Sequence, residues 1–299
     1  MRGTRVRILV VGIASGALAL SALATTHAAA DPANGPYVAL GDSYTAGPFI
    51  PDLTGDPITC GRSTGNYPSL VARELGSTSF TDASCSGATT EHMTHAQKPV
   101  LFGTNQPQFD RLNKDVRVVT LGIGGNDADL IDTVSACIAN GAVDSPGPDE
   151  APCADAQQVD GRDRLAARID AVGPKVAEVL RGIHERAPGA RVFVVGYPAV
   201  LPSPADASCR EPLSLTEGDV VYLTARLRQL DGELADAARA NEATFVDTYT
   251  SGVGHDACKP ATVRWVEPVL PGNAAFPLHP NANGMADTAA DVARAIRAS

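Results

Sequence analysis

A serine early in the chain has the setting of a nucleophile. Residues 37–40 form a short apolar run that leads directly into Gly41, Asp42 and Ser43. A strand that stops at a glycine and turns sharply can present the next hydroxyl side chain at the carboxyl edge of a sheet, where open α/β sheets place their chemistry. A serine hydroxyl alone is a weak nucleophile, so this prediction requires a general base and donors for an oxyanion elsewhere in the chain.

Gly87 and Asn126 are the candidate oxyanion donors, because each follows an expected strand. A glycine lets a backbone N–H approach an oxyanion without a Cβ in the way, and Asn126 offers a side-chain N–H. With the backbone N–H of Ser43, they would form a hole of three donors. In the alternative interpretation, Gly87 only permits a turn with positive φ, and Asn126 only caps a helix that begins near Ala128.

His279 is the candidate general base. It lies in the segment 276–284, immediately before the last expected helix. A histidine can take the proton from a serine hydroxyl and return it to a leaving alcohol. A loop histidine is more often a polar surface group, but the other histidines have weaker settings in polar runs, on a helix, beside a cysteine loop or near the N-terminus. These are His27, His92, His95, His184 and His255.

The glycines of residues 121–125 do not indicate a nucleotide site, because neither Gly-x-Gly-x-x-Gly nor a Walker Lys-Ser/Thr pair follows them. The acids Asp127, Asp129 and Asp132 lack the spacing and the terminal glutamate of an EF-hand. We interpret them as first-turn acids of a helix.

The elements that must position these residues alternate in type. Apolar runs typical of strands alternate with helical patterns, which predicts βα units and a parallel sheet. Apolar residues at three- and four-residue steps predict one long amphipathic helix through 165–183, a second through 220–234 and a last one through 283–296. The expected strands are 37–40, 79–82, 116–123, 192–196 and 244–246.

Residues 1–30 have the pattern of a secretory signal peptide. Three arginines precede an apolar run that ends near Ala24, and an Ala-x-Ala-like site follows. An uncleaved membrane anchor is the alternative, but the run is short for a bilayer and contains Gly and Ser. We therefore expect cleavage after Ala30 and a single domain over residues 31–299, which is long enough for one large core.

The charge balance argues against a nucleic-acid partner. Three of the 24 basic residues and none of the 34 acidic residues lie in 1–30, which leaves 21 basic against 34 acidic residues and a net charge of −13. A nucleic-acid-binding domain carries a basic surface instead. We interpret this acidity as a contribution to solubility.

Six cysteines in a secreted chain of this size predict three disulfides. Six cysteines allow 15 pairings, and the sequence alone does not choose among them. Sequential pairs would each enclose a loop-rich segment, and we expect this arrangement. The expected pairs are Cys60–Cys85, Cys137–Cys153 and Cys209–Cys258.

Four short motifs together resemble the GDSL-type SGNH hydrolases, in particular their secreted bacterial lipase and esterase branch. The resemblance covers essentially the whole of 31–299, and four motifs in the family's order are far more specific than any one of them. The six cysteines resemble the three local disulfides of that branch. The motifs are Gly41-Asp42-Ser43-Tyr44, Ser86-Gly87, Gly124-Gly125-Asn126-Asp127 and His279-Pro280-Asn281.

The resemblance implies a fold and a set of roles. The implied fold is a three-layer α/β/α sandwich of the SGNH/flavodoxin-like type with a five-stranded parallel sheet. Ser43 would be the nucleophile, His279 the base, and Gly87 and Asn126 the oxyanion donors. The resemblance also implies no metal and no organic cofactor.

One position departs from the family pattern. Many members carry an aspartate three residues before the histidine, where this chain has Phe276. Some secreted relatives orient the histidine with a main-chain carbonyl, and we expect the carbonyl of Phe276 to do so here. A neutral acceptor can fix the tautomer of the ring, although it stabilises the imidazolium less than a carboxylate does. Asp247 or Asp256 from a neighbouring loop is the alternative.

These inferences predict a secreted serine hydrolase of carboxylic esters of lipids: a triacylglycerol lipase or carboxylesterase, with phospholipids among the candidate substrates. The alternatives are an esterase for short-chain esters or acetylated polysaccharides and, in a different class, a secreted binding module on an inactive scaffold. The expected partner is a small-molecule or lipid ester. We expect no nucleic acid, no stable membrane span and a monomer.

Overall fold

The computed structural model describes the chain continuously from Asn34 onward, apart from a few short internal segments. The predicted signal peptide therefore lies outside the described residues, apart from Met1 and Gly3, and stays a prediction. In the described part of the chain, no helix combines the length and the apolar character needed to cross a membrane. The described residues are 1, 3, 34–98, 102–144, 147, 150–203 and 209–299.

Five parallel strands form one sheet in the order β2-β1-β3-β6-β7. Gly41 at the end of β1 lies in register with Gly122 at the end of β3, so both strands deliver their following residues to the same edge. This arrangement confirms the predicted five-stranded parallel sheet, with small shifts at the strand ends. The strands are β1 (Tyr37–Gly41), β2 (Phe80–Asp82), β3 (Val118–Gly122), β6 (Arg191–Val195) and β7 (Thr244–Val246).

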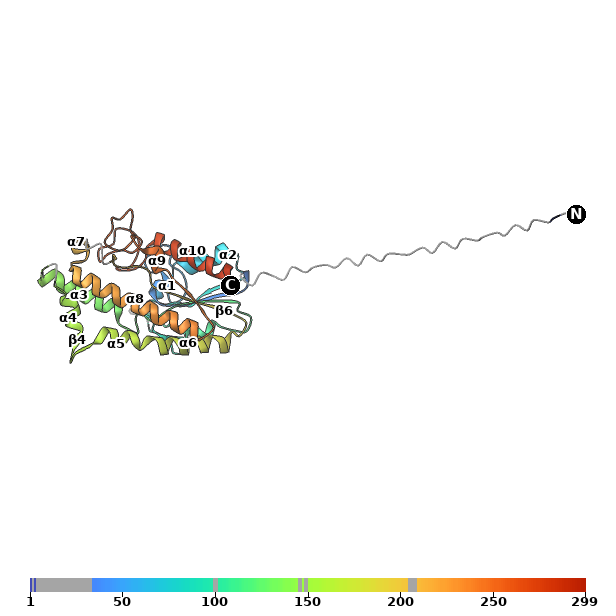
Figure 1. Cartoon of the computed structure of the whole chain (residues 1–299), viewed down its shortest axis with the longest axis horizontal. Helices are drawn as coiled ribbons and strands as arrows, with labels where there is room; N and C mark the ends of the chain where they lie inside the picture. Colours follow the sequence, from blue (N-terminus) through green and yellow to red (C-terminus); the bar gives the residue numbers. More distant parts are fainter. Residues whose placement is uncertain (2, 4–33, 99–101, 145–146, 148–149, 204–208) are drawn as a thin grey trace. The chain divides into compact units, whose positions relative to one another are not determined.

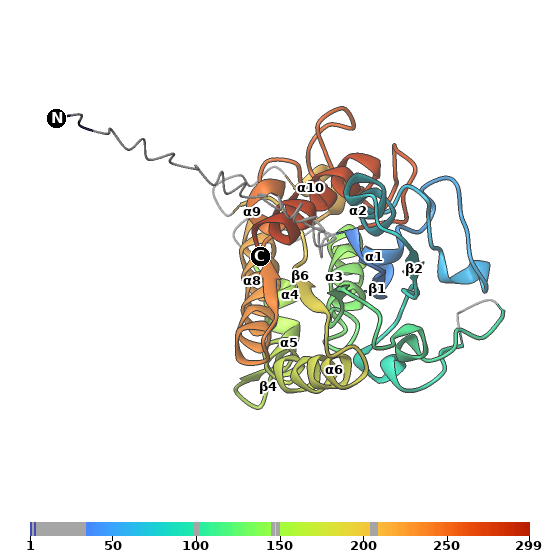
Figure 2. The same ribbon diagram turned by 90° about the vertical axis from the view of Figure 1, so that its right-hand side faces the viewer.

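Helices cover both faces of the sheet, and the alternation of side chains along the strands explains this. Tyr37 and Ala39 of β1 pack into a core with α2 (Tyr67–Leu75) and α10 (Ala282–Ala298). The residues between them face the opposite core, which includes the apolar residues of α6 (Val172–Arg186) and α8 (Glu217–Ala240). Figures 1 and 2 show α2 and α10 on one side of the sheet and α6 and α8 on the other, which gives the predicted three-layer α/β/α fold.

The prediction of one long helix through 165–183 was wrong. The chain forms two helices there, α5 (Arg164–Asp170) and α6, separated at Ala171. Pro174 explains the break, because proline has no N–H to donate to the carbonyl four residues earlier and its ring clashes with that carbonyl. The apolar stripe nevertheless stays buried along both helices.

The remaining elements are short or lie outside the sheet. A two-stranded antiparallel hairpin, β4 (Gln158–Val159) and β5 (Arg162–Asp163), was not predicted. The predicted helix near Ala128 begins at Leu130. The other helices are α1 (Ser43–Ala46), η2 (Ile58–Cys60), η3 (Thr90–Met93), η4 (Gln108–Arg111), α3 (Leu130–Asp144), α4 (Pro152–Gln157), α7 (Arg210–Leu213) and α9 (Tyr249–Gly252).

The six cysteines pair sequentially, as we expected. Each disulfide ties a segment outside the sheet to the body of the domain, and such a cross-link stabilises the fold chiefly by restricting the unfolded chain. The pairs are Cys60–Cys85, Cys137–Cys153 and Cys209–Cys258.

Candidate active site

Ser43 is the first residue of α1, the single turn of helix directly after β1. Asp42 caps this turn, since its Oδ1 accepts the backbone N–H of Tyr44 at 2.9 Å. Gly41 leaves no space for a side chain, because a Cβ there would lie 2.2 Å from Oγ1 of Thr45 and 2.5 Å from the carbonyl oxygen of Gly122. The close contact between the ends of β1 and β3 therefore fixes the position of Ser43.

His279 meets Ser43 across 236 residues of sequence. Its Nε2 lies 2.7 Å from Oγ of Ser43, and both side chains are buried. Its Nδ1 lies 2.7 Å from the carbonyl oxygen of Pro277. Because a carbonyl can only accept, Nδ1 carries the proton, and Nε2 presents its lone pair to the serine hydroxyl.

The predicted role of the Phe276 carbonyl was wrong. This carbonyl accepts the backbone N–H of His279 at 3.1 Å in a tight turn, and the carbonyl of Pro277 faces the ring instead. Asp247 accepts the two backbone N–H groups and the hydroxyl at the start of α9, and Asp256 accepts the N–H of Cys258. The Nδ1 partner is thus a main-chain carbonyl, one residue later than expected.

Burial sets the protonation state of this histidine. It lowers the pKa of His279 to about 4, and the hydrogen bond to the Pro277 carbonyl offsets only part of that effect. The ring is therefore neutral near pH 7. A neutral imidazole whose Nε2 faces a hydroxyl is able to accept its proton.

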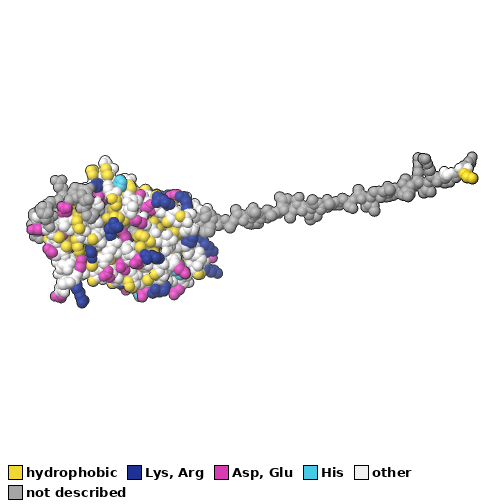
Figure 3. Space-filling model, viewed as in Figure 1, with side chains coloured by type: hydrophobic (Ala, Val, Ile, Leu, Met, Phe, Trp, Pro, Cys, Tyr) yellow, Lys and Arg dark blue, Asp and Glu magenta, His cyan; other side chains and the backbone are white. Residues whose placement is uncertain are grey.

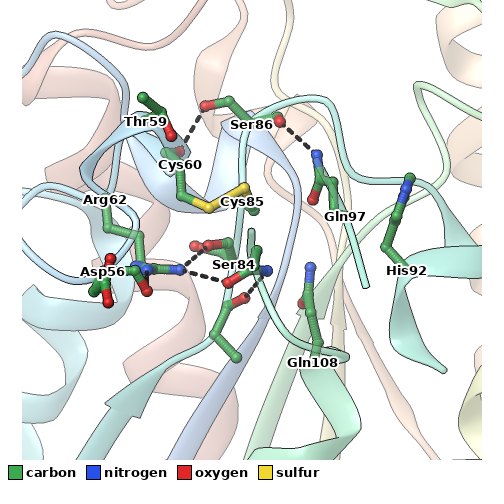
Figure 4. Close-up of a disulfide and its surroundings, with 12 residues drawn as sticks. Asp56, Thr59, Cys60, Arg62, Ser84, Cys85, Ser86, His92, Gln97 and Gln108 are labelled. Atoms are coloured by element: carbon green, nitrogen blue, oxygen red, sulfur yellow. Dashed lines mark hydrogen bonds between the residues drawn. A yellow bond between two sulfur atoms is a disulfide. The ribbon is translucent and has the colours of Figure 1, made fainter. Parts of the chain in front are cut away.

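Gly87 lies in a turn that is tied to the Ser43 turn. The N–H of Cys85 donates to the carbonyl of Gly41 at 3.0 Å, and the disulfide links Cys85 to Cys60. Figure 4 shows two further ties on the next residue: Oγ of Ser86 donates to the carbonyl of Cys60, and Nε2 of Gln97 donates to the carbonyl of Ser86, each at 2.8 Å.

The conformation of Gly87 suits a donor role. Its φ of 76° lies in the left-handed region that favours glycine. Among the hydrogen bonds of the described residues, none uses the backbone N–H of Gly87 or of Ser43. Both groups are therefore available to a ligand.

Asn126 follows the glycine pair after β3. Its Nδ2 donates to the carbonyl of Ala88 at 2.8 Å, so the side chain joins this turn to the Gly87 turn, while α3 begins only at Leu130. Next to it, Asp127 accepts the N–H and the hydroxyl of Thr90. A primary amide has two N–H donors, so Asn126 keeps one beyond its contact with Ala88.

A cavity and a pair of aromatic rings flank the site. A cavity of about 500 Å³ opens beside Asn126. Its lining is mixed, with polar residues such as Glu91 and Lys175 and apolar residues such as Met93 and Phe109. On the other side, the exposed rings of Phe49 and Phe276 lie 5.4 Å apart between centroids, and the ring of Phe276 lies 5.1 Å from that of His279. The rim of the site next to the histidine is therefore aromatic.

Three polar residues that the sequence analysis did not select hold this site. Gln108 pairs with both backbone groups of Gly41, accepting its N–H at 2.8 Å and donating to its carbonyl at 2.9 Å. Tyr197 contacts Asp42, and Glu267 lies buried in the loop that carries His279. Only Tyr197 had a usable signal, because it follows an expected strand at the sheet edge that holds Ser43.

No metal-binding group of three or more His, Cys, Asp or Glu side chains occurs within the described residues.

Asp42, beside Ser43, is fully buried, and this burial raises its pKa to about 7, although the hydrogen bonds from Tyr197 and Tyr44 oppose the increase.

Comparisons with known proteins cover the whole segment that holds the site. The model of the GDSL-like Lipase/Acylhydrolase family matches residues 39–286. The chain is 40% identical over 294 residues to "Lipase 2" of Streptomyces coelicolor, with 96% of each chain covered. A phospholipase A1 structure from Streptomyces albidoflavus NA297 is similar with a TM-score of 0.71 and 25% identity, over 88% of this chain and 99% of that chain. An extracellular lipase structure from Streptomyces rimosus is similar with a TM-score of 0.67 and 27% identity, over 87% of this chain and 99% of that chain.

Proposed function

The chain belongs to the GDSL-like lipase/acylhydrolase family and is a carboxylic ester hydrolase, and on this premise we propose that it is a secreted lipase that cleaves fatty acyl esters through an acyl-enzyme on Ser43. The observation that carries the proposal is the buried contact of 2.7 Å between Oγ of Ser43 and Nε2 of His279. A serine and a base within hydrogen-bond distance, with the base oriented by a third group, are the arrangement that activates a serine nucleophile.

The first step is attack on the ester carbonyl. As Oγ of Ser43 bonds to the carbonyl carbon, Nε2 of His279 takes the hydroxyl proton. The carbonyl of Pro277 holds Nδ1–H and keeps the ring in the tautomer that this step needs. The carbonyl is neutral, so it stabilises the imidazolium less than a carboxylate would, and orientation is its main contribution.

The negative charge that develops on the carbonyl oxygen needs donors. We assign this role to the backbone N–H groups of Ser43 and Gly87 and to the second amide hydrogen of Asn126. Preorganised donors of this kind each contribute about 10²–10³ in rate in other hydrolases. His279 then gives its proton to the leaving alcohol, and a water activated by the same ring hydrolyses the acyl-serine.

Two observations support lipid esters as the substrate class. The relatives include proteins named as lipases and a phospholipase A1. The exposed aromatic pair of Phe49 and Phe276 gives the site an apolar rim next to His279, which suits an acyl chain or a lipid surface. Short-chain and acetylated polysaccharide esters are the outcomes against which this choice is tested.

Secretion after cleavage at Ala30 is part of the proposal. Three disulfides suit an oxidising compartment, and one similar structure is described as an extracellular lipase. We also propose a monomer without a nucleic-acid partner. On the face viewed in Figure 3, acidic and basic side chains are interspersed and form no basic patch.

The test is secretion of the full-length chain from a bacterial host, with wild type and Ser43→Ala assayed on p-nitrophenyl esters of increasing chain length. We expect turnover by wild type alone, with an optimum at medium or long chains, and the same circular dichroism for both proteins. Turnover by a folded Ser43→Ala variant would refute the mechanism. An optimum at acetate, or activity confined to acetylated polysaccharides, would refute the lipid assignment, and N-terminal sequencing of the product tests cleavage at Ala30.

A further inference from the structure

The hydroxyl of Tyr197 lies between the two turns that carry the proposed nucleophile and the amide donor. It donates to Oδ2 of Asp42 at 2.5 Å and accepts the backbone N–H of Gly125 at 2.8 Å. Asp42 directly precedes Ser43, and Gly125 directly precedes Asn126. A phenol can donate and accept at once, so one hydroxyl joins both turns.

The contact between Tyr197 and the glycine turn is close as well as polar. A Cβ at Gly125 would lie 3.0 Å from the hydroxyl oxygen of Tyr197 and 3.1 Å from the ring carbon that carries it. The backbone of the turn therefore lies directly against the end of the ring. A small displacement of the ring would move the turn, and Asn126 with it.

Tyr197 is itself held in place by the body of the fold. It follows β6, and its backbone N–H donates at 2.8 Å to Oδ1 of Asp231, a buried residue of α8. Its ring packs edge-on against Tyr44, with the centroids 5.1 Å apart. The ring of Tyr44 in turn lies 4.7 Å from the ring of His279 between centroids, so the tyrosine pair also contacts the segment that carries the base.

Asp42 cannot easily replace the contact if the hydroxyl is removed. Its Oδ1 already accepts the N–H of Tyr44, and Oδ2 faces Tyr197. Without the hydroxyl, Oδ2 of Asp42 and the N–H of Gly125 would both be left unpaired in a buried position, which is strongly unfavourable. The glycine turn would relax toward other partners.

We propose that Tyr197 is a positioning residue, which holds Asn126 at the distance from Ser43 that the oxyanion requires. The inference rests on the proposed function, since it concerns the same oxyanion hole. The hydroxyl touches neither the ester nor the reacting atoms. It acts by fixing the separation of two turns that belong to neighbouring strands, β1 and β3.

The decisive variant is Tyr197→Phe, which removes one oxygen and keeps the ring. The matched control is Tyr222→Phe, because the hydroxyl of Tyr222 also donates to a carboxylate, Oδ1 of Asp163 at 2.9 Å, on the outer layer of helices. We expect Tyr197→Phe to lower kcat about 10- to 100-fold on p-nitrophenyl butyrate, less than the loss of a whole donor, with KM within about threefold of wild type. Tyr222→Phe should leave both constants unchanged.

A second readout separates positioning from a merely structural role. Affinity for a boronic acid that forms a tetrahedral adduct on the serine should fall in Tyr197→Phe by about the same factor as kcat/KM. Titration with a fluorophosphonate counts the folded, reactive sites in each preparation, so that lost protein is not taken for lost rate. Either of two results would overturn the proposal: an unchanged kcat per reactive site, or a rise in KM without a fall in kcat.

Asp42→Asn provides the second variant if Tyr197→Phe does not fold. In asparagine an NH₂ group takes the place of one of the two carboxylate oxygens. Because this group cannot accept, either Tyr44 or Tyr197 loses its acceptor in place, and we expect a similar loss of kcat. If neither variant folds, Tyr197 is a residue of the folding core and the proposal is overturned. The proposed function fails separately: wild type would then lack ester turnover, or Ser43→Ala would retain it, whatever Tyr197→Phe does.

Discussion

The two halves of the proposed dyad are held in different ways. Ser43 follows β1, and its turn is bonded to the end of β3, to Gln108 and to the Cys85 turn. His279 lies in residues 253–281, a long irregular segment between α9 and α10 in which the only strand-like pairing described is a single bridge from Val266 to Pro280. The nucleophile is thus held by the sheet, whereas the base is held by a loop.

A buried carboxylate takes the place of secondary structure in that loop. Glu267 is fully buried and accepts from Arg264, from the backbone and amide of Asn273, from the N–H of Gly272 and from the amide of Asn281. Its backbone groups also pair with those of Leu278 and His279. Burial alone would raise the pKa of Glu267, but these hydrogen bonds outweigh it and lower the pKa to about 2.

A catalytic side chain can therefore be positioned either by the backbone hydrogen bonds of a sheet, as Ser43 is, or by one buried carboxylate that accepts many hydrogen bonds, as His279 is. The ladder is distributed over many backbone hydrogen bonds between parallel strands. The charge network depends on one residue, because removal of that residue leaves several buried donors unpaired. The two halves should therefore respond differently to single substitutions.

The largest effect is expected where the halves meet. Ser43→Ala and His279→Ala should each lower kcat by about 10⁵–10⁶, and the double variant should be no worse than either, because nucleophile and base act as one unit. Steady-state kinetics on one ester checks this, with Ser135→Ala on the exposed side of α3 as the control. Losses that multiply in the double variant would show that the two residues act independently.

The next effect concerns the sheet half alone. Asn126→Ala should lower kcat about 10²–10³-fold with little change in KM, since it removes one proposed oxyanion donor. Asn241→Ala is the control, because its Nδ2 also donates to a main-chain carbonyl at 2.8 Å, at the end of α8. An equal rise in KM in place of the fall in kcat would mean that Asn126 binds the ground state as strongly as the transition state.

The loop half should lose stability rather than only rate. Glu267→Ala should lower the free energy of unfolding by about 3–5 kcal/mol, the usual effect of breaking a buried ion pair from one side. Glu74→Ala, which breaks an exposed pair with Arg297, should lower it by less than about 1 kcal/mol. Urea unfolding at pH 7 measures both. Equal effects would show that the Glu267 network does not hold the loop.

The sign of the pH dependence follows from the lowered pKa of Glu267. Its folded pKa of about 2 lies below its ordinary value of 4.5, so the stabilisation is complete above about pH 4.5 and disappears as the pH falls through 2. The difference between wild type and Glu267→Ala should therefore shrink in acid. A difference that grows on acidification would contradict this account.

The sequence predicted the sheet half much better than the loop half. Gly41 and Gly122 end apolar runs. This local pattern was enough to predict that the two strands end at the same edge of the sheet. The partners Gln108 and Tyr197 lie 67 and 155 residues from their contacts, so no local pattern could join them. Pro174 was a local signal for the break between α5 and α6. The prediction missed the break because the apolar residues keep the same helical spacing through both helices.

The loop half offered no period from which to predict. The choice between the carbonyls of Phe276 and Pro277 depends on the path of the main chain, and Leu278 has a φ of 61°, which a non-glycine residue rarely adopts. Glu267 stands in a stretch with neither strand nor helix spacing. The groups that donate to its carboxylate come together only in the folded loop.

Rate against pH tests the burial of the loop histidine. Because His279 must be neutral to accept a proton and burial lowers its pKa to about 4, kcat/KM of wild type should fall only below about pH 5, not near 6.5. Circular dichroism at each pH confirms that the protein is folded. A limb near pH 7 that disappears in Asp42→Asn would belong to Asp42, whose burial raises its pKa to about 7, and would show that the sheet half controls the profile.

The smallest effect is expected from substitution of Asp247. This residue was one alternative for the aspartate that many family members carry at the position of Phe276. Asp247→Asn should change kcat/KM less than about twofold, because the Nδ1 partner of His279 is a main-chain carbonyl and asparagine is as good a helix cap as aspartate. The measurement is kcat/KM on the same ester from pH 5 to 9. A loss of 10³-fold or more would mean that a carboxylate orients the base after all. The loop half would then depend on two acids, Asp247 for the orientation of the ring and Glu267 for the path of the chain.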